Sequence, residues 1–279
     1  LYSSAASDVY KRQAEKYRQI WTSQGSPLQS GMASLAHKVQ ASFNEQDKAT
    51  LVRHGMSYGS PSIKQALGEL KAEGCDELVV LSLYPQNALS TTGVVADKTL
   101  AALSALDWHP QTKLVGYYSA HLLYLEAIAA SIRAAGFDSS AGDKLLFAFH
   151  SIPVRDIRNG DDYEDKARAT ANAVARLLEL DVQDWALGFQ CRFDKARSWL
   201  GPFIPEALQT LGAPRGRLFV VAPNFSIDCL ETLYDIDIEL RQQVCEDPAL
   251  QIESDRFVYV PCLNAVSYTH LTLPTNREV

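Results

Sequence analysis

A histidine that follows an apolar run is the first side chain suited to acid–base or metal chemistry. His150 comes directly after the apolar residues 144–149 and stands three positions before Pro153, so we expect it at the carboxyl end of a strand. An imidazole in that place accepts a proton near neutral pH or ligates a metal. A structural histidine that caps a buried strand is the simpler explanation of this residue on its own.

Three carboxylates further along the chain form a second candidate for chemistry. Glu231, Asp235 and Glu239 are spaced at i, i+4 and i+8, which places them on one face of a predicted helix. Like charges at this spacing repel by about 0.2–0.5 kcal/mol per pair, so the helix itself gains no stability from them. Apolar residues border the row, which fits the wall of a channel, whereas a solvated helix face is the ordinary alternative.

Aromatic and hydroxyl side chains in several turns suit a site for a flat apolar ligand. Tyr58 follows one predicted strand, Tyr84 and Ser90 follow the next, and Ser26 stands in a turn that leads into a predicted helix. Turn and cap chemistry explains each of these residues separately. Taken together, they predict one rim formed by Tyr58, Tyr84 and small polar groups.

Strands and helices alternate along the interior of the chain. Continuous apolar runs, typical of parallel strands covered on both faces, predict strands at 50–55, 77–83, 113–117, 144–149, 185–189, 217–222 and 257–260. Helical patterns lie at 29–42, 62–73, 91–106, 121–135, 162–179, 205–211 and 228–245. The alternation predicts an α/β fold with parallel sheets, one or two in number, and ligand binding at the loops after the strands.

Composition excludes several classes of function. The 279 residues carry a formal net charge of −7 without a basic cluster, which argues against nucleic acid as a partner. No apolar run approaches the roughly 20 residues of a transmembrane helix. The five cysteines are widely spaced, which argues against a disulfide framework, a zinc site and an iron–sulfur cluster. We expect a soluble, cytoplasmic protein with one large domain or two smaller ones.

The two ends of the chain differ in character from its interior. Residues 1–13 begin with Leu1 and show no convincing period, and residues 266–279 match neither a strand nor an amphipathic helix. We expect the chain to be a fragment whose two ends are foreign to the natural protein, with ordinary termini as the alternative. The functional argument therefore uses residues 14–265.

Eight short motifs, in a fixed order, give the chain a resemblance to a known family. It resembles ferrochelatase, the terminal enzyme of haem synthesis, in its bacterial protoporphyrin-using form, over residues 14–265. The motifs are GSPL at 25–28, MSYGSP at 56–61, LYPQ at 83–86 with ST at 90–91, HSIP at 150–153, GDDY at 160–163, FQCRF at 189–193, DCLETL at 228–233 and LN at 263–264.

The resemblance implies a lyase that inserts Fe²⁺ into protoporphyrin IX and releases two protons. It implies two Rossmann-like halves with parallel sheets, over residues 14–118 and 119–265, with the porphyrin in the cleft between them. The opening strand of the family and its final helix have no counterpart in this sequence. We therefore expect part of one porphyrin wall to be missing.

The resemblance also assigns roles to individual residues. His150 and Glu231 would face each other across the macrocycle as the catalytic and metal-binding pair. Asp235 and Glu239 would continue Glu231 as a relay for protons or metal, which gives the carboxylate row a chemical purpose. The residues implied to contact the porphyrin are Tyr58, Tyr84, Ser90 and Ser26.

Fe²⁺ and protoporphyrin IX are then substrates, and no tightly bound cofactor or iron–sulfur cluster is expected. The sequence leaves the oligomeric state and peripheral contact with a membrane surface open. Two alternatives remain, namely a cobalt or nickel tetrapyrrole chelatase of the same fold and a non-catalytic tetrapyrrole-binding protein. The full motif set favours ferrochelatase over the first. The pairing of His150 with Glu231 argues against the second, because binding alone needs one ligand or none.

Overall fold

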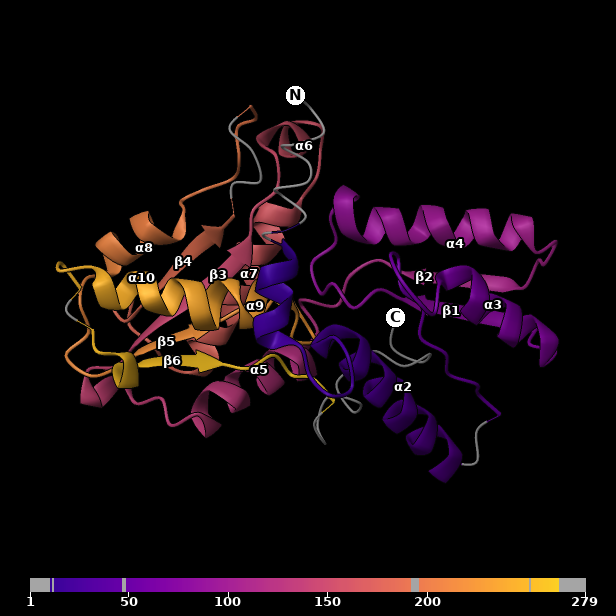
Figure 1. The fold of residues 1–279 in the computed structure, drawn as a ribbon, viewed down its shortest axis with the longest axis horizontal. Helices are drawn as coiled ribbons and strands as arrows, with labels where there is room; N and C mark the ends of the chain where they lie inside the picture. The colour runs from indigo at the N-terminus through magenta and orange to yellow at the C-terminus, as the bar shows by residue number, and fades with distance from the viewer. Residues whose placement is uncertain (1–10, 12, 47–48, 192–195, 251, 266–279) are drawn as a thin grey trace.

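Two separate parallel sheets form the framework of the protein. The computed structural model describes residues 11, 13–46, 49–191, 196–250 and 252–265. The smaller sheet pairs β1 (Glu77–Leu81) with β2 (Gln111–Val115), and the larger has the order β4-β3-β5-β6. The two sheets lie toward opposite ends of the molecule's long axis (Figure 1). The strands of the larger sheet are β3 (Lys144–His150), β4 (Trp185–Gln190), β5 (Leu218–Val221) and β6 (Phe257–Val260).

Every ladder in the two sheets is parallel, and helices connect the strands. This confirms the predicted α/β fold with parallel sheets. The six strands overlap the predicted runs, although β2 begins two residues earlier than expected. None of the helices in the described part of the chain is both long and apolar enough to cross a bilayer.

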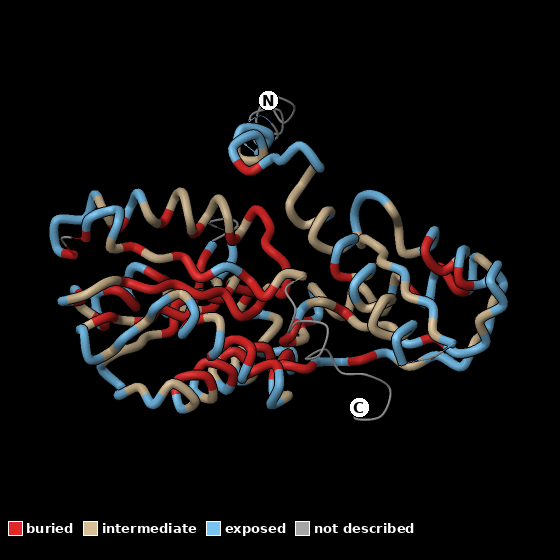
Figure 2. Tube along the Cα trace, turned by 90° about the horizontal axis from the view of Figure 1, so that it is seen from below, coloured by how far each residue is buried: buried red, intermediate tan, exposed pale blue. Residues whose placement is uncertain are grey.

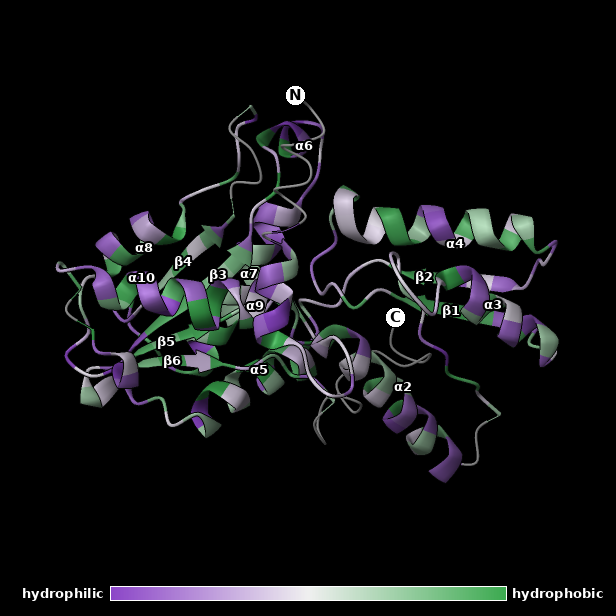
Figure 3. Ribbon diagram, in the orientation of Figure 1, coloured by the Kyte–Doolittle hydropathy of each residue, from purple (hydrophilic) through white to green (hydrophobic). Residues whose placement is uncertain are grey.

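The larger sheet is buried on both faces, which explains why its strands are continuous apolar runs. Alternate residues of β3 point to opposite faces. Its odd-numbered residues join the core under α5 (Leu122–Ala134) and α7 (Tyr163–Leu177), and its even-numbered apolar residues join the core under α8 (Ile204–Leu211) and α10 (Arg241–Glu246). Figure 2 shows these buried strands between two helical layers, and Figure 3 shows their hydrophobic colouring. Each fully buried Leu or Phe contributes about 1.5–3 kcal/mol to this core.

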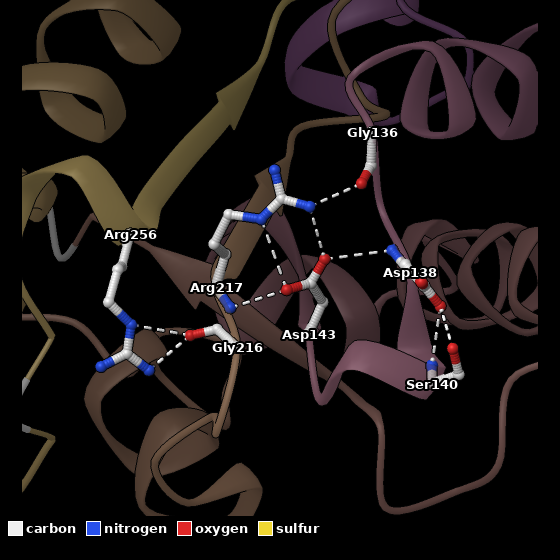
Figure 4. Close-up of polar contacts among 7 residues, drawn as sticks. All are labelled: Gly136, Asp138, Ser140, Asp143, Gly216, Arg217 and Arg256. Atoms are coloured by element: carbon white, nitrogen blue, oxygen red, sulfur yellow. Dashed lines mark hydrogen bonds and ion pairs between the residues drawn. The ribbon is translucent and has the colours of Figure 1, made fainter.

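The amino ends of β3 and β5 are joined by a buried carboxylate (Figure 4). Asp143 accepts hydrogen bonds from the backbone N–H of Arg217 at 2.7 Å and from its guanidinium Nη2 at 2.9 Å. The N–H of Asp138 donates to the same carboxylate at 3.0 Å. Because this network fixes the ends of two neighbouring strands, it sets the register of the sheet at the end opposite His150.

The smaller sheet has a smaller core. Leu78 of β1 packs with residues of α3 (Ile63–Ala72) and α4 (Val94–Ala105), while α2 (Pro27–Glu45) lies between the two sheets in Figure 1. Val79 and Leu114 each remain 40% exposed. One face of this sheet is therefore only partly covered.

The strand expected at 50–55 is not formed. Met56, just after this segment, makes only an isolated bridge to Ser62. A side chain of α2 satisfies part of the backbone of segment 50–55 instead. The amide of Gln40 donates to the carbonyl of Thr50 at 2.8 Å and accepts from the N–H of Val52 at 2.7 Å. The apolar run was a correct sign of extended chain, but no neighbouring strand in the described part of the protein forms a ladder with it.

The single helix expected at 228–245 is divided into three parts. They are α9 (Leu230–Leu233), a π-helix η3 (Asp235–Leu240) and α10 (Arg241–Glu246). The N–H of Glu239 donates to the carbonyl of Tyr234, five residues earlier, at 2.8 Å. A second π-helix, η1 (Leu89–Gly93), precedes α4, which the sequence had predicted to begin at residue 91. π-Turns are rare and occur frequently at functional sites.

Two helical segments of the protein were not predicted from the sequence. A short helix that was not expected, α6 (Val154–Arg158), follows β3. Helical structure at residues 13–20 precedes α2. The two ends expected to be foreign, 1–13 and 266–279, lie outside the described residues except for positions 11 and 13.

Candidate active site

His150 ends β3, where its backbone pairs with Gln190 of β4. Its Nδ1 lies 2.9 Å from the carbonyl oxygen of Ser151. Because a carbonyl only accepts hydrogen bonds, this contact places the proton of the neutral ring on Nδ1 and leaves the lone pair on Nε2. The hydroxyl of Tyr163 donates to the carbonyl of His150 at 2.8 Å, which fixes the backbone beneath the ring.

Glu231 lies in the first turn of α9, after the loop that follows β5. A buried carboxylate holds this loop in place. Asp228 accepts a hydrogen bond from Thr232 Oγ1 at 3.0 Å, from the hydroxyl of Tyr259 at 2.6 Å and from Asn264 Nδ2 at 2.8 Å. The start of α9, and with it Glu231, is thereby attached to the end of β6.

His150 and Glu231 line one cavity of about 520 Å³. Its size is within the range of about 300–1,000 Å³ that is usual for small-molecule sites. Tyr84 and Ser90, which follow β1, line the same cavity. The structure therefore brings together four of the residues singled out in the sequence, from the loops after β1, β3 and β5.

The tyrosines of this cavity are held in their neutral form. Desolvation, followed by the negative charge of Glu231, raises the pKa of Tyr84 to about 12. Burial, followed by the charge of Asp161, raises the pKa of Tyr163 well above its ordinary value. Both phenols are therefore hydroxyl donors at neutral pH rather than bases.

Asp235 and Glu239 line a second cavity, of about 500 Å³, rather than the cavity of His150. Lys16 lies between them, with its Nζ 2.9 Å from Asp235 Oδ1 and 3.4 Å from Glu239 Oε2. Burial alone would lower the pKa of Lys16, but its hydrogen bond to Asp235 and the two negative charges raise it. The carboxylate row thus runs from one cavity, at Glu231, into the next.

All three carboxylates lie close enough to the thiol of Cys191 for their charges to affect its pKa. Burial, followed by the charges of Asp235, Glu231 and Glu239, raises the pKa of its thiol. All three acidic side chains are half-buried, whereas Ile236 on the same helical stretch is fully buried. Asp235 and Glu239 share Lys16 as an ion-pair partner, whereas Glu231 lines the cavity of His150.

Besides Asp235 and Glu239, two residues predicted to contact the porphyrin do not line the cavity of His150. Tyr58 is 79% exposed, and the ammonium of Lys98 lies 3.6 Å from the centre of its ring. Ser26 is the N-cap of α2, where its hydroxyl accepts from the N–H of Gln29 at 3.2 Å. The simple cap chemistry considered for Ser26 is what its contacts show.

Arg155 and Arg197 also line the cavity of His150, although no sequence pattern marked them. Gln86 and Asn224 also line it, and Gln86 Oε1 and Asn224 Oδ1 are buried without a hydrogen-bond partner in the described part of the chain. Gln86 belongs to the LYPQ motif, so a signal for it existed. The positions of the two arginines depend on how the loops after β3 and β4 fold, which periodicity does not report.

Asp161 joins the start of α7 to the start of η1, next to Tyr163 and Ser90, which line this cavity. Its Oδ1 accepts from the N–H of Tyr163 at 3.0 Å, as expected of a residue that begins a helix. Its Oδ2 accepts from the N–H of Leu89 at 2.7 Å, the first residue of η1. Asp162 is the N-cap of α7 but makes no side-chain capping bond, so the carboxylate of Asp161 takes the first N–H of the helix instead.

Comparison with solved structures supports the fold. SirB from Bacillus subtilis with Fe³⁺ matches 89% of this chain and 88% of its own, with a TM-score of 0.60 and 11% sequence identity. The sirohydrochlorin chelatase SirB from Bacillus subtilis subspecies spizizenii in complex with cobalt matches with a TM-score of 0.51 and 13% identity. At these identities the likeness concerns the fold alone, and it is the chelatase fold that the sequence predicted.

Sequence comparison identifies the family. The family model for ferrochelatase matches residues 1–273. Ferrochelatase of Nitrosococcus oceani is 36% identical over 90% of this chain and 67% of its own length, and that of Aromatoleum aromaticum is 38% identical over 91% and 68%. Ferrochelatase of Nitrosomonas europaea is 37% identical over 96% and 75%. The chain therefore belongs to the ferrochelatase family, the lyases that insert iron into porphyrin during haem synthesis.

Proposed function

We propose that His150 and Glu231 are the catalytic pair of this ferrochelatase and face each other across the bound porphyrin. The observation that carries this proposal is that both side chains line one cavity although they come from different loops. Each is held by contacts of its own, His150 by the carbonyl of Ser151 and α9 by the network of Asp228. The pair is therefore positioned before the substrate arrives.

His150 supplies the proton acceptor in this proposal. Insertion of Fe²⁺ into a porphyrin removes two protons from pyrrole nitrogens, so the site needs a base beside the macrocycle. The unprotonated Nε2 takes one proton and becomes an imidazolium, and the hydrogen bond from Nδ1 to the carbonyl of Ser151 stabilises that cation. Glu231 offers a carboxylate that binds the incoming metal or accepts the second proton.

Asp235 and Glu239 extend Glu231 as the proton and metal relay. Support for this role comes from the half-burial of all three carboxylates and from their combined effect on the pKa of Cys191. The row leads out of the cavity of His150 into a second cavity. Protons that leave the porphyrin centre, and the iron that enters it, can then move along the carboxylate row without crossing the face of the macrocycle.

Tyr84 and Ser90 are proposed to contact the porphyrin directly, because both line the cavity of His150. Tyr58 is close enough to Tyr84 to affect its pKa, so we place it at the edge of the same site. Ser26 remains in the proposal with the weakest support, because its hydroxyl already caps α2.

The substrates proposed are protoporphyrin IX and Fe²⁺, with no resident cofactor and no iron–sulfur cluster. Support for the last point is the wide spacing of the five cysteines in the sequence, without a Cys-x-x-Cys pair. We place the enzyme in the cytoplasm, where peripheral contact with a membrane surface is compatible with its fold.

The test is metal insertion under anaerobic conditions. Fe²⁺ and protoporphyrin IX are mixed with the protein, and loss of porphyrin fluorescence is followed together with the rise of haem absorbance. We expect His150→Ala to lower the rate at least about 100-fold, as is typical for loss of a general base, while porphyrin binding persists.

The matched control is His109→Ala, because the His109 side chain is 80% exposed and does not line the cavity. Retained turnover in His150→Ala would remove His150 from the mechanism. Quenching of fluorescence without haem formation in the unmodified protein would favour a binding protein, and insertion of cobalt or nickel alone would favour the other chelatases.

A further inference from the structure

A lysine of α4 lies against the loop at 56–61, which holds the MSYGSP motif. The ammonium of Lys98 lies 3.6 Å from the centre of the Tyr58 ring, and it donates a hydrogen bond to the carbonyl of Ser57. One side chain therefore contacts two successive residues of the loop, although 41 positions separate Lys98 from Ser57 in the sequence. An ammonium within about 6 Å of a ring centre is attracted to the face of the ring.

The backbone of the loop at 56–61 is closed by its own contacts. The N–H of Met56 donates to the carbonyl of Pro61 at 2.8 Å, and Gly59 has a φ of +105°, in the region that favours glycine. The side chain at the tip of the loop is different, because Tyr58 is 79% exposed. Little of it packs against protein, so the contact with Lys98 is well placed to fix the orientation of its ring.

Lys98 itself has a rigid support. Thr99, the next residue, is fully buried, and Ala102, one turn further along α4, belongs to the core of the smaller sheet. In Figure 1 α4 lies along this sheet. The helix continues directly from η1, which carries Ser90. The contact therefore connects Tyr58 to the helical segment that holds a second residue proposed to touch the porphyrin.

We propose that Lys98 is a positioning residue for the porphyrin, which acts through the ring of Tyr58. Its ammonium covers one face of that ring, and the high exposure of Tyr58 leaves the opposite face open. A flat apolar macrocycle that enters beside Tyr84 can pack its edge on this open face. The inference rests on the proposed contact between Tyr58 and the porphyrin.

A ring that is already oriented makes binding more favourable. A side chain that becomes immobile only when the ligand arrives reduces the affinity, whereas one that is fixed beforehand does not. A single cation–π contact at an exposed site is weak, so its loss corresponds to about a two- to fivefold loss of affinity. His150 and Glu231 follow strands of the larger sheet, so the effect should fall on KM rather than on kcat.

Titration of the iron-free protein with protoporphyrin IX, followed by porphyrin fluorescence, tests this inference. We expect Lys98→Met to raise the Kd about two- to fivefold, and to raise the KM for porphyrin by the same factor at unchanged kcat. Lys98→Arg should keep the Kd of the unmodified protein, because a guanidinium also stacks on an aromatic face. Lys64→Met, on the exposed face of α3, removes the same charge elsewhere and should leave the Kd unchanged.

A double-mutant cycle with Tyr58→Leu decides whether the ring carries the effect. In the Tyr58→Leu background, Lys98→Met should cause no further loss of affinity. An equal loss in that background would overturn the inference, because the ammonium would then attract the carboxylates of the porphyrin directly. An unchanged Kd in Lys98→Met, or a fall in kcat at unchanged KM, would overturn it as well. Circular dichroism checks that each variant is folded.

The same experiment distinguishes this inference from the proposed catalytic pair. The titrations contain no iron, so porphyrin binding without haem formation would defeat the roles of His150 and Glu231 while the binding series still decides the role of Lys98. Absence of porphyrin binding by the unmodified protein would remove the site and this inference with it.

Discussion

At the scale of single residues, the site depends on protonation states that contacts have already set. The carbonyl of Ser151 determines which nitrogen of His150 is free, and the charge of Glu231 helps to keep Tyr84 neutral. Periodicity marked His150 and Glu231 as candidates because strand ends and helix faces can be deduced from it, and only the resemblance to the family paired them. The sequence could not give the ring tautomer or the ion pair of Lys16, because both depend on atoms that approach each other only in the folded chain.

The order of the carboxylates leads to a prediction about rates. Glu231 lines the cavity of His150, whereas Glu239 lines the neighbouring cavity beyond Asp235. Glu231→Gln should therefore slow metal insertion by about 100-fold or more, and Glu239→Gln by about tenfold or less. Both rates are measured with Fe²⁺ and protoporphyrin IX at saturating concentrations. The opposite order would contradict the assignment of Glu231 as the inner carboxylate.

The raised pKa of Tyr84 predicts a change in stability at alkaline pH. Below pH 10 the folded and unfolded chains both keep this proton, so Tyr84 adds no pH dependence. Between pH 10 and about 12 the unfolded chain loses the proton first, and the free energy of unfolding falls as the pH rises. Urea unfolding of Tyr84→Phe should show a shallower fall over this interval. Tyr117→Phe, at an exposed tyrosine outside the cavity of His150, is the control.

At the scale of elements, continuous apolar runs located the strands of the larger sheet because both faces of that sheet are covered. The same rule misplaced a strand at 50–55, where the run is extended but the side chain of Gln40 takes the place of a neighbour. Helical periodicity placed Asp235 and Glu239 on one face but missed the π-turn that begins at Asp235. A π-turn changes the winding by less than one residue per turn, which a sequence pattern of three acids does not resolve.

At the scale of the whole molecule, the cavity is assembled from parts that belong to different sheets. Gln86, which follows β1, donates from its amide to Thr170 Oγ1 at 3.0 Å and to the carbonyl of Pro223 at 3.2 Å. Asp161 makes the second connection through Leu89. The motifs identified the family and so implied a site between two units. These bonds join motif side chains to Thr170, Pro223 and Leu89, which belong to none of the motifs, so the pairings could not be deduced from the sequence.

Removal of the Asp161 carboxylate should loosen this connection. Asp161→Ala leaves the buried N–H of Tyr163 and that of Leu89 without their acceptor, which should lower the free energy of unfolding by about 1–3 kcal/mol. The Michaelis constant for porphyrin should rise as well, because Leu89 begins the π-helix that carries Ser90. Urea unfolding and steady-state kinetics measure the two effects. Asp162→Ala is the control, and an equal loss there would contradict a specific role for Asp161.

The division of the cavity between the sheets has a consequence for turnover. His150 and Glu231 both follow strands of the larger sheet, whereas Tyr84 and Ser90 follow β1 of the smaller one. A hinge motion of the smaller sheet would therefore widen or narrow the entrance without altering the separation of His150 and Glu231, the two groups proposed to react. Movement of the smaller sheet can then control when a flat, rigid substrate enters and when its metallated product leaves. The larger sheet meanwhile holds His150 and Glu231 at a constant distance.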